Sequence, residues 1–189
     1  MPTPRFKIGF IGTHGVGKTT LCYGLAARLK ARDVVLDIVH EVARRCPLPI
    51  NESTSAAAQS WILHTQIADE LVAAARHPVV ICDRSVLDNY VYLLTAGGRT
   101  PALDELVRWW LGTYDRLVYV PIVEEPRADG MRSTDAAFQR AIDERVVREL
   151  GERGLSQTLR LAPDQRERWL DIVEDDIRTQ LDTPQLVLL

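Results

Sequence analysis

The sequence predicts an α/β fold in which helices cover both faces of a five-stranded parallel sheet. Short apolar runs rich in Val and Ile alternate along the chain with longer segments of helical period. Strands that are apolar on both faces are typical of a parallel sheet covered on both sides. Parallel neighbours also need crossover connections, which the helical segments supply. A length of 189 residues fits one domain.

Five apolar runs are the expected strands, and six segments of helical period are the expected helices. In chain order the strands are Phe6–Ile11, Val34–Val39, Val79–Cys82, Leu117–Val120 and Gln157–Leu161. The helices are Lys18–Ala31, Thr54–Arg76, Val86–Ala96, Pro101–Leu111, Thr134–Leu150 and Pro163–Gln180. The second helix has one apolar stripe, formed by Trp61, Ala68, Val72 and Ala75. Gly97 ends the third helix, a first-turn proline begins the fourth, and Thr134 caps the fifth.

Composition and charge exclude several classes of protein. Hydrophobic residues make up 46% and charged residues 26%, which are values of a globular protein. A net charge of −3 provides no general attraction for a nucleic acid polymer or an anionic membrane. No apolar run approaches the ~20 residues of a membrane span. Three cysteines without CxxC spacing fit reduced thiols, so we expect a cytoplasmic protein without a leader segment.

A phosphate-binding loop follows the first strand. The stretch from Gly12 to Thr19 matches GxxxxGK[ST] between an expected strand and an expected helix. Its glycines let backbone N–H groups turn toward an anion, and the helix start adds a positive dipole end. Lys18 supplies charge for the β- and γ-phosphates, and the Thr19 hydroxyl is suited to Mg²⁺. The expected nucleotide contacts are Gly12, Thr13, His14, Gly15, Val16, Gly17, Lys18, Thr19 and Thr20.

The identity of the nucleotide follows from what surrounds the loop. The chain lacks the Asn-Lys-x-Asp motif that reads guanine, and Val86 stands where a GTPase switch loop has glycine. ATP is therefore the expected nucleotide. His14 has an alternative role as a tolerated loop residue whose side chain points away from the phosphates.

Two acidic residues follow expected strands. Asp83 directly follows the third strand, where a carboxylate can hold Mg²⁺ together with Thr19. The alternative is an Asp that caps a helix. Glu41 ends the second strand, where it can orient an acceptor hydroxyl and take its proton. The alternative for Glu41 is a solvent-facing side chain. Because ligands bind at the carboxyl ends of parallel strands, both residues are expected near the loop.

The segments Glu41-Val42-Ala43-Arg44-Arg45-Cys46 and Asp83-Arg84-Ser85-Val86 resemble motifs of the P-loop deoxynucleoside kinases. The chain is also similar to nicotinamide riboside kinases and to small P-loop proteins labelled AAA-type ATPases, which carry a motif like Asp129-Gly130-Met131-Arg132-Ser133. The resemblance covers four motifs between residues 9 and 140 and implies a P-loop NTPase fold with strand order 2-3-1-4-5. The chain departs from the motifs of the deoxynucleoside kinases at three positions, which concern the acceptor. No Pro follows Glu41, Arg45 stands where those kinases have Trp, and Asp83 stands where they have Glu.

The resemblance also implies a lid and an acceptor-binding region within a single kinase domain of residues 1–189. The lid is expected at about 122–140, where Arg127 and Arg132, and more weakly Arg140, would approach the transferring phosphate. Ordinary surface ion pairs are the alternative for these arginines. The acceptor region is expected at about 41–76. Its candidate contacts are Glu41, Arg44, Trp61, His64, Gln66 and Arg84. The alternative for Trp61 is core packing, and that for His64 is a solvated or core histidine.

These observations favour an ATP-dependent phosphotransferase whose catalytic residues are Lys18, Glu41, Arg84, Arg127 and Arg132. The expected cofactors are ATP and Mg²⁺, and the expected partner is a small, nucleoside-like acceptor; a homodimer is compatible with the sequence. Arg44 and Arg84 fit an acceptor hydroxyl or an acceptor phosphate, so a nucleoside monophosphate kinase is one alternative. An NTP-hydrolysing regulatory ATPase is another. The adenine is expected near Ala162–Arg166.

Overall fold

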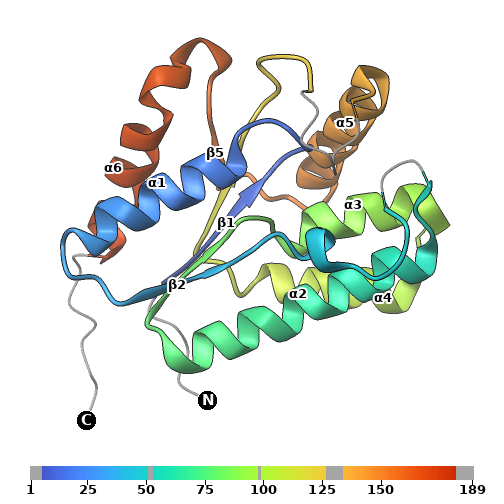
Figure 1. Ribbon diagram of the computed structural model, residues 1–189, viewed down its shortest axis with the longest axis horizontal. Helices are drawn as coiled ribbons and strands as arrows, with labels where there is room; N and C mark the ends of the chain where they lie inside the picture. Colours follow the sequence, from blue (N-terminus) through green and yellow to red (C-terminus); the bar gives the residue numbers. More distant parts are fainter. Residues whose placement is uncertain (1–5, 51–52, 98, 127–133, 182–189) are drawn as a thin grey trace.

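The protein is described by a computed structural model that covers residues 6–50, 53–97, 99–126 and 134–181 (Figure 1). Five parallel strands form one open sheet in the spatial order β2-β3-β1-β4-β5. The parallel pairing and this order confirm the predicted fold class. The strands are β1 (Phe6–Ile11), β2 (Leu36–Val39), β3 (Val79–Cys82), β4 (Arg116–Tyr119) and β5 (Leu159–Arg160).

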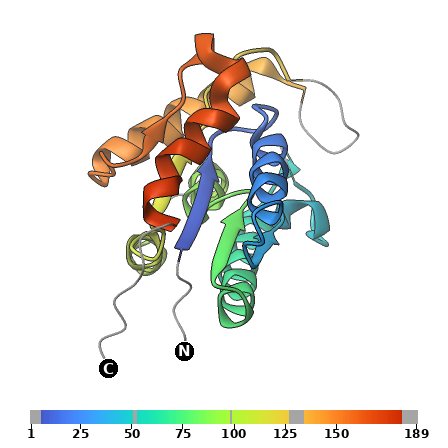
Figure 2. The ribbon, with the colours of Figure 1, turned by 90° about the vertical axis from the view of Figure 1, so that its left-hand side faces the viewer.

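Helices cover both faces of the sheet (Figures 1 and 2). One face carries α1 (Lys18–Lys30) and α6 (Trp169–Leu181). The other carries α2 (Ala56–Arg76), α3 (Val86–Gly97), α4 (Pro101–Leu111) and α5 (Ala136–Glu152). The short 3₁₀ helices are η1 (Val42–Arg45) and η3 (Pro163–Arg168). Among the helices that the structure describes, none is long and apolar enough to cross a membrane.

The side chains of β1 divide between two apolar cores. Phe6, Ile8 and Phe10 are buried under α1 and α6, whereas Ile11 is buried in the core formed with α3 and α5. Successive residues of a strand point to opposite faces, so one apolar strand contributes to both cores. Two of the three cysteines, Cys22 and Cys82, are buried, and Cys46 is partly exposed after η1.

The buried face of α2 differs from the predicted apolar stripe, which is wrong. Ala68, Val72 and Ala75 are exposed, and Trp61 is half-buried. The residues buried instead are Ala58, Gln59, Ile62, Leu63, Gln66, Glu70 and Ala73. The polar members of this face can be buried because they find hydrogen-bond partners inside the protein, as Gln66 and Glu70 do with each other. An apolar pattern alone therefore selects the wrong side of this helix.

Three predicted boundaries are also corrected. The cap of α5 is Asp135, not Thr134, because the Asp135 carboxylate accepts hydrogen bonds from the N–H groups of Ala137 and Phe138 at 2.7 and 3.1 Å. The helix predicted over Pro163–Gln180 begins as the separate turn η3. The last strand has two residues, because the residues before it form a turn closed by a hydrogen bond from the Thr158 N–H to the Leu155 carbonyl.

The pairing register brings three chain segments to one edge of the sheet. Cys82 of β3 lies level with Gly9 of β1 and Val39 of β2, so β2 and β3 end together, and β1 runs two residues further to Ile11 at the same edge. The segments that leave these ends are residues 12–17, 40–45 and 83–85. Ligands of open parallel sheets bind at this edge, which makes it the place to look for a functional site.

Candidate active site

The loop between β1 and α1 depends on glycine at three positions. Gly12, Gly15 and Gly17 have φ angles of 149°, 77° and 98°, which other residues rarely adopt. A Cβ on Gly12 would also lie 2.5 Å from the carbonyl oxygen of Val120. Gly17 caps α1 and has no side chain that could bond to the first N–H groups of this helix. The loop and helix start together have the geometry of an anion-binding site.

Lys18 is buried inside this loop. Its Nζ donates hydrogen bonds to the carbonyl oxygens of Gly12 and Thr13 at 2.7 and 2.5 Å. Burial and the positive charge of Arg84 lower the pKa of Lys18 to about 8, against the opposing effect of nearby carboxylates. The ammonium group is thus held within the loop by two neutral carbonyl oxygens, which a phosphate oxygen can replace.

Thr19 and Asp83 lie together at the carboxyl end of β3. The Thr19 hydroxyl is 2.8 and 3.1 Å from the two carboxylate oxygens of Asp83. The Asp83 N–H donates to the Val39 carbonyl oxygen, which fixes the residue beside β2. Burial raises the pKa of Asp83, whereas the Thr19 hydrogen bond and the Lys18 charge lower it. The sequence predicted this juxtaposition.

Glu41 lies between two arginines. One of its oxygens accepts from Nε and Nη2 of Arg84 at 2.8 and 2.7 Å, and the other accepts from Nε of Arg44 at 2.9 Å. Burial alone would raise the pKa of Glu41, but the charges of Arg84 and Lys18 outweigh it and lower the pKa to about 2. Glu41 is therefore a charged carboxylate close to the loop rather than a solvent-facing one.

Asp88, which the sequence analysis missed, ties the loop to α3. One of its carboxylate oxygens accepts from the Gly12 N–H at 2.9 Å, and the other accepts from the N–H and hydroxyl of Ser85 at 2.9 Å each. Ser85 and Asp88 have the spacing of a capping box, and this spacing is the sequence signal that could have identified Asp88. The Asp88 side chain thus holds both Gly12 of the loop and Ser85, the residue that follows Arg84.

His14 is buried against α3 and α5. Its Nδ1 is 3.0 Å from the Tyr92 hydroxyl, and its ring lies 5.8 Å from that of Phe138. Gln139 Nε2 donates to the His14 carbonyl oxygen at 2.9 Å. These contacts match the alternative in which His14 is a tolerated loop residue whose side chain points away from the phosphate-binding side of the loop.

A family model described as an AAA domain matches residues 7–168. The chain belongs to this AAA domain family. Among solved structures, this chain is similar to the deoxyadenosine kinase from M. mycoides with bound dATP. The TM-score is 0.55 and the sequence identity is 14%. The similarity covers 92% of this chain and 99% of that one. No curated protein matches the sequence. The predicted resemblance to P-loop kinases is thereby confirmed at the level of the fold.

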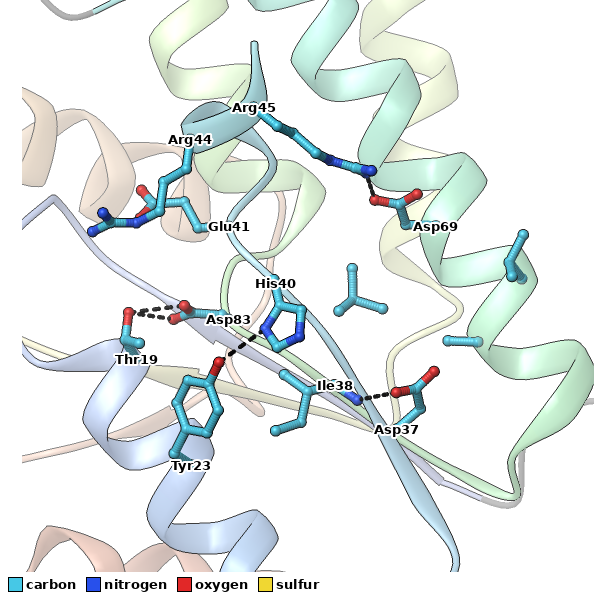
Figure 3. Close-up of a pocket in the computed structure, with 13 residues that line it drawn as sticks. Thr19, Tyr23, Asp37, Ile38, His40, Glu41, Arg44, Arg45, Asp69 and Asp83 are labelled. Carbon is cyan, nitrogen blue, oxygen red and sulfur yellow. Dashed lines mark hydrogen bonds and ion pairs between the residues drawn. The ribbon is translucent and has the colours of Figure 1, made fainter. Parts of the chain in front are cut away.

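A pocket of about 570 Å³ opens beside the charged cluster of the AAA domain (Figure 3). Thr19 and Tyr23 of α1 form one wall, and the outer edge of β2 forms the floor. Arg45 is paired with Asp69 of α2 across the opposite wall. The described residues that line it are Thr19, Tyr23, Asp37, Ile38, Val39, His40, Glu41, Arg44, Arg45, Asp69, Val72, Ala73 and Asp83. The pocket therefore reaches from the loop to the middle of β2 and α2.

The other predicted acceptor contacts of the AAA domain do not line this pocket. Trp61 is half-buried, and His64 is exposed with its Nδ1 2.7 Å from the Ser60 carbonyl oxygen. Gln66 is fully buried, and its Nε2 donates to Glu70 and to the Arg84 carbonyl oxygen at 2.9 and 3.0 Å. Of the six predicted acceptor contacts, Glu41 and Arg44 are the two among the described residues that line this pocket.

The structure describes only some of the remaining predicted contacts. Arg127 and Arg132 fall outside the described residues. Arg140 is an exposed residue of α5. In the segment expected near the adenine, the Ala162 carbonyl oxygen accepts from Trp169 Nε1 at 2.7 Å. Arg166 is paired with Glu124 at 2.8 Å, so η3 is joined to the segment after β4.

Proposed function

We propose that the protein is an ATP-dependent phosphotransferase that passes the γ-phosphate to a hydroxyl of a nucleoside-like small molecule. The observation that carries this proposal is the position of Glu41. Its charged carboxylate lies on the rim of a pocket of about 570 Å³, in one cluster with Lys18, Thr19 and Asp83. An enzyme that transfers phosphate only to water needs no such pocket beside its carboxylate.

The loop fits the phosphates of ATP. Glycine at positions 15 and 17 lets the backbone turn its N–H groups toward an anion, whereas the Gly12 N–H is bonded to Asp88. A Cβ at Gly12 would obstruct the fold of the loop. Lys18 would exchange its bonds to the Gly12 and Thr13 carbonyls for β- and γ-phosphate oxygens. A pKa of about 8 rises when a dianionic phosphate approaches, so bound nucleotide keeps Lys18 charged.

Thr19 and Asp83 fit Mg²⁺ as a hydroxyl and a carboxylate ligand. In the part of the chain that the structure describes, no group of three or more His, Cys, Asp or Glu side chains could hold a metal. This agrees with Mg²⁺, which keeps several waters and takes phosphate oxygens instead of an all-protein cage. When bound, the ion neutralises charge on the β- and γ-phosphates.

Glu41 positions the acceptor hydroxyl. A carboxylate with a pKa of about 2 is a weak base for a free alcohol. Phosphoryl transfer passes through a loose transition state, in which the hydroxyl proton becomes acidic only as the new O–P bond forms. Glu41 therefore orients the hydroxyl first and receives its proton late, while Arg84 and Arg44 stabilise the carboxylate in its charged form.

The charges of the pocket favour an acceptor without a phosphate. Its two arginines are each paired with a carboxylate, Arg44 with Glu41 and Arg45 with Asp69. Four lining carboxylates outnumber these two arginines: Asp37, Glu41, Asp69 and Asp83. A monophosphate would have to displace an existing ion pair in an acidic pocket. A neutral nucleoside-like acceptor fits better, in keeping with the deoxyadenosine kinase of similar fold.

The remaining sequence predictions complete the proposal. Within a single kinase domain, residues 41–76 form the acceptor side, and the lid at about 122–140 supplies Arg127 and Arg132. Water must be excluded while the phosphate is transferred, which is the role of such a lid.

The test is a panel of nucleosides and nucleoside monophosphates incubated with ATP and Mg²⁺. We expect at least one nucleoside to raise ADP formation above the rate with water alone, and the matching monophosphate to be inactive. Stimulation by monophosphates alone would favour the nucleotide kinase alternative. ADP formation that no acceptor stimulates would favour the regulatory ATPase.

A further inference from the structure

A buried ion pair lies behind the Arg84 segment, away from the phosphate loop. Lys7 Nζ is 2.9 Å from Glu70 Oε2, and the two side chains are 4% and 0% exposed. The ammonium group also lies over the rings of Trp110 and Tyr114, 4.7 and 4.4 Å from their centroids. Burying two charges is costly unless both are fully hydrogen-bonded, so such a pair calls for a reason beyond stability.

Four donors saturate the Glu70 carboxylate. Oε2 accepts from Lys7 Nζ and from Trp110 Nε1 at 2.9 and 2.7 Å. Oε1 accepts from the Tyr114 hydroxyl and from Gln66 Nε2 at 2.5 and 2.9 Å. These donors come from β1, α2, α4 and the turn before β4, so Glu70 fixes elements that are far apart in the sequence.

Two of these donors reach the segment that carries Arg84. Gln66 Nε2 also donates to the Arg84 carbonyl oxygen at 3.0 Å. The Tyr114 hydroxyl accepts from the Val86 N–H at 3.1 Å. The backbone is therefore held on both sides of Ser85 by side chains anchored on Glu70. The guanidinium group of Arg84, which this backbone carries, forms the ion pair with Glu41.

We infer that Glu70 is a positioning residue, which acts through Gln66 and Tyr114 to fix the backbone of residues 84–86 and so the Arg84–Glu41 pair. The inference rests on the proposed function for its effect on phosphate transfer. Its structural content, a backbone held by Glu70, does not depend on the reaction. Lys7 supplies the counter-charge of this buried carboxylate.

The chain offers a matched pair of variants. Tyr114→Phe keeps the ring over Lys7 but removes the hydroxyl that joins Glu70 to the Val86 N–H. Trp110→Phe also removes one donor to Glu70, but Trp110 does not bond to residues 84–86. If Trp110→Phe does not fold, Thr113→Ala replaces it, because Thr113 bonds to Lys7 and to the Trp110 carbonyl only.

Hydrogen exchange by mass spectrometry and steady-state kinetics are measured on both variants. We expect Tyr114→Phe to speed exchange in a peptide containing Val86 at least tenfold. We also expect its kcat with the best acceptor to fall about tenfold, with KM for ATP unchanged. The control variant should keep the wild-type exchange rate in that peptide and a kcat within twofold of the wild type. This should hold even if its thermal midpoint falls as far as that of Tyr114→Phe.

Equal losses in Tyr114→Phe and its control would overturn the inference, because they would show a general packing effect. Unchanged exchange at Val86 in Tyr114→Phe would overturn it as well. The exchange measurement also separates the two proposals. If the wild-type protein phosphorylates no acceptor, the proposed function fails, while faster exchange in Tyr114→Phe alone still supports the positioning role.

Discussion

Glu41 and Glu70 are both buried carboxylates surrounded by cations or hydrogen-bond donors, yet only Glu41 lies at a pocket. The Glu41 partners are arginines, and one of them, Arg44, is 40% exposed. The Glu70 partners are an ammonium group, an indole and an amide that are buried, and the phenol of the half-buried Tyr114. A carboxylate that works on a substrate thus keeps exchangeable partners, whereas one that fixes the backbone is saturated and closed to solvent.

The largest expected effect is on stability and comes from the closed cluster. Lys7→Met leaves Glu70 buried without its counter-charge, which should lower the free energy of unfolding by about 3–5 kcal/mol. Urea denaturation measures this loss. The double variant Lys7→Met/Glu70→Gln should recover part of it, because the unpaired charge is gone. A loss below about 1 kcal/mol in the single variant would remove the contrast between the two carboxylates.

The next effect is on catalysis and comes from the open cluster. Glu41→Gln should lower acceptor-dependent ADP formation roughly a hundredfold or more, because the amide orients but does not take a proton. ATP binding, measured by equilibrium titration, should persist. Glu105→Gln is the matched control, since it removes one carboxylate charge from an exposed pair on α4. Equal rates in the two variants would exclude Glu41 from the mechanism.

The smallest effect is the dependence of stability on pH. The pKa of Glu41 is about 2 in the folded protein and 4.5 in an unperturbed chain. A depressed folded pKa stabilises the protein above pH 4.5, and this contribution is lost as the pH falls toward 2. The contribution of Glu41 to the free energy of unfolding amounts to about 3 kcal/mol. Denaturation series in this range should therefore show a steeper loss for the wild type than for Glu41→Gln, and parallel curves would contradict the assignment.

The sequence predicted those parts of the site that local chemistry determines. The glycines and Lys18 of the loop must be adjacent in sequence to form an anion site, so a motif reveals them. Asp83 and Glu41 were predicted because each follows an apolar strand, and parallel strands bring their carboxyl ends together. The sheet follows from the same logic, since apolar strands and crossover helices leave few possible topologies.

The remaining parts depend on contacts between distant segments. Glu70 belongs to the buried side of α2 only because donors from β1, α4 and the turn before β4 converge on it. No periodicity along α2 records those donors, and the exposed Val72 made the opposite face look apolar. The lining of the pocket depends on such contacts too: Tyr23 of α1, Ile38 of β2 and Asp69 of α2 come together there, whereas His64 is exposed and does not line it.

The different burial of the three cysteines gives the protein a built-in attachment point for a reporter dye. Burial raises the pKa of the Cys22 and Cys82 thiols, so neither forms a reactive thiolate in the folded protein. Cys46 is partly exposed and directly follows Arg45, which lines the pocket. A maleimide fluorophore should therefore label Cys46 selectively in the unmutated chain and register movements of the pocket wall in real time.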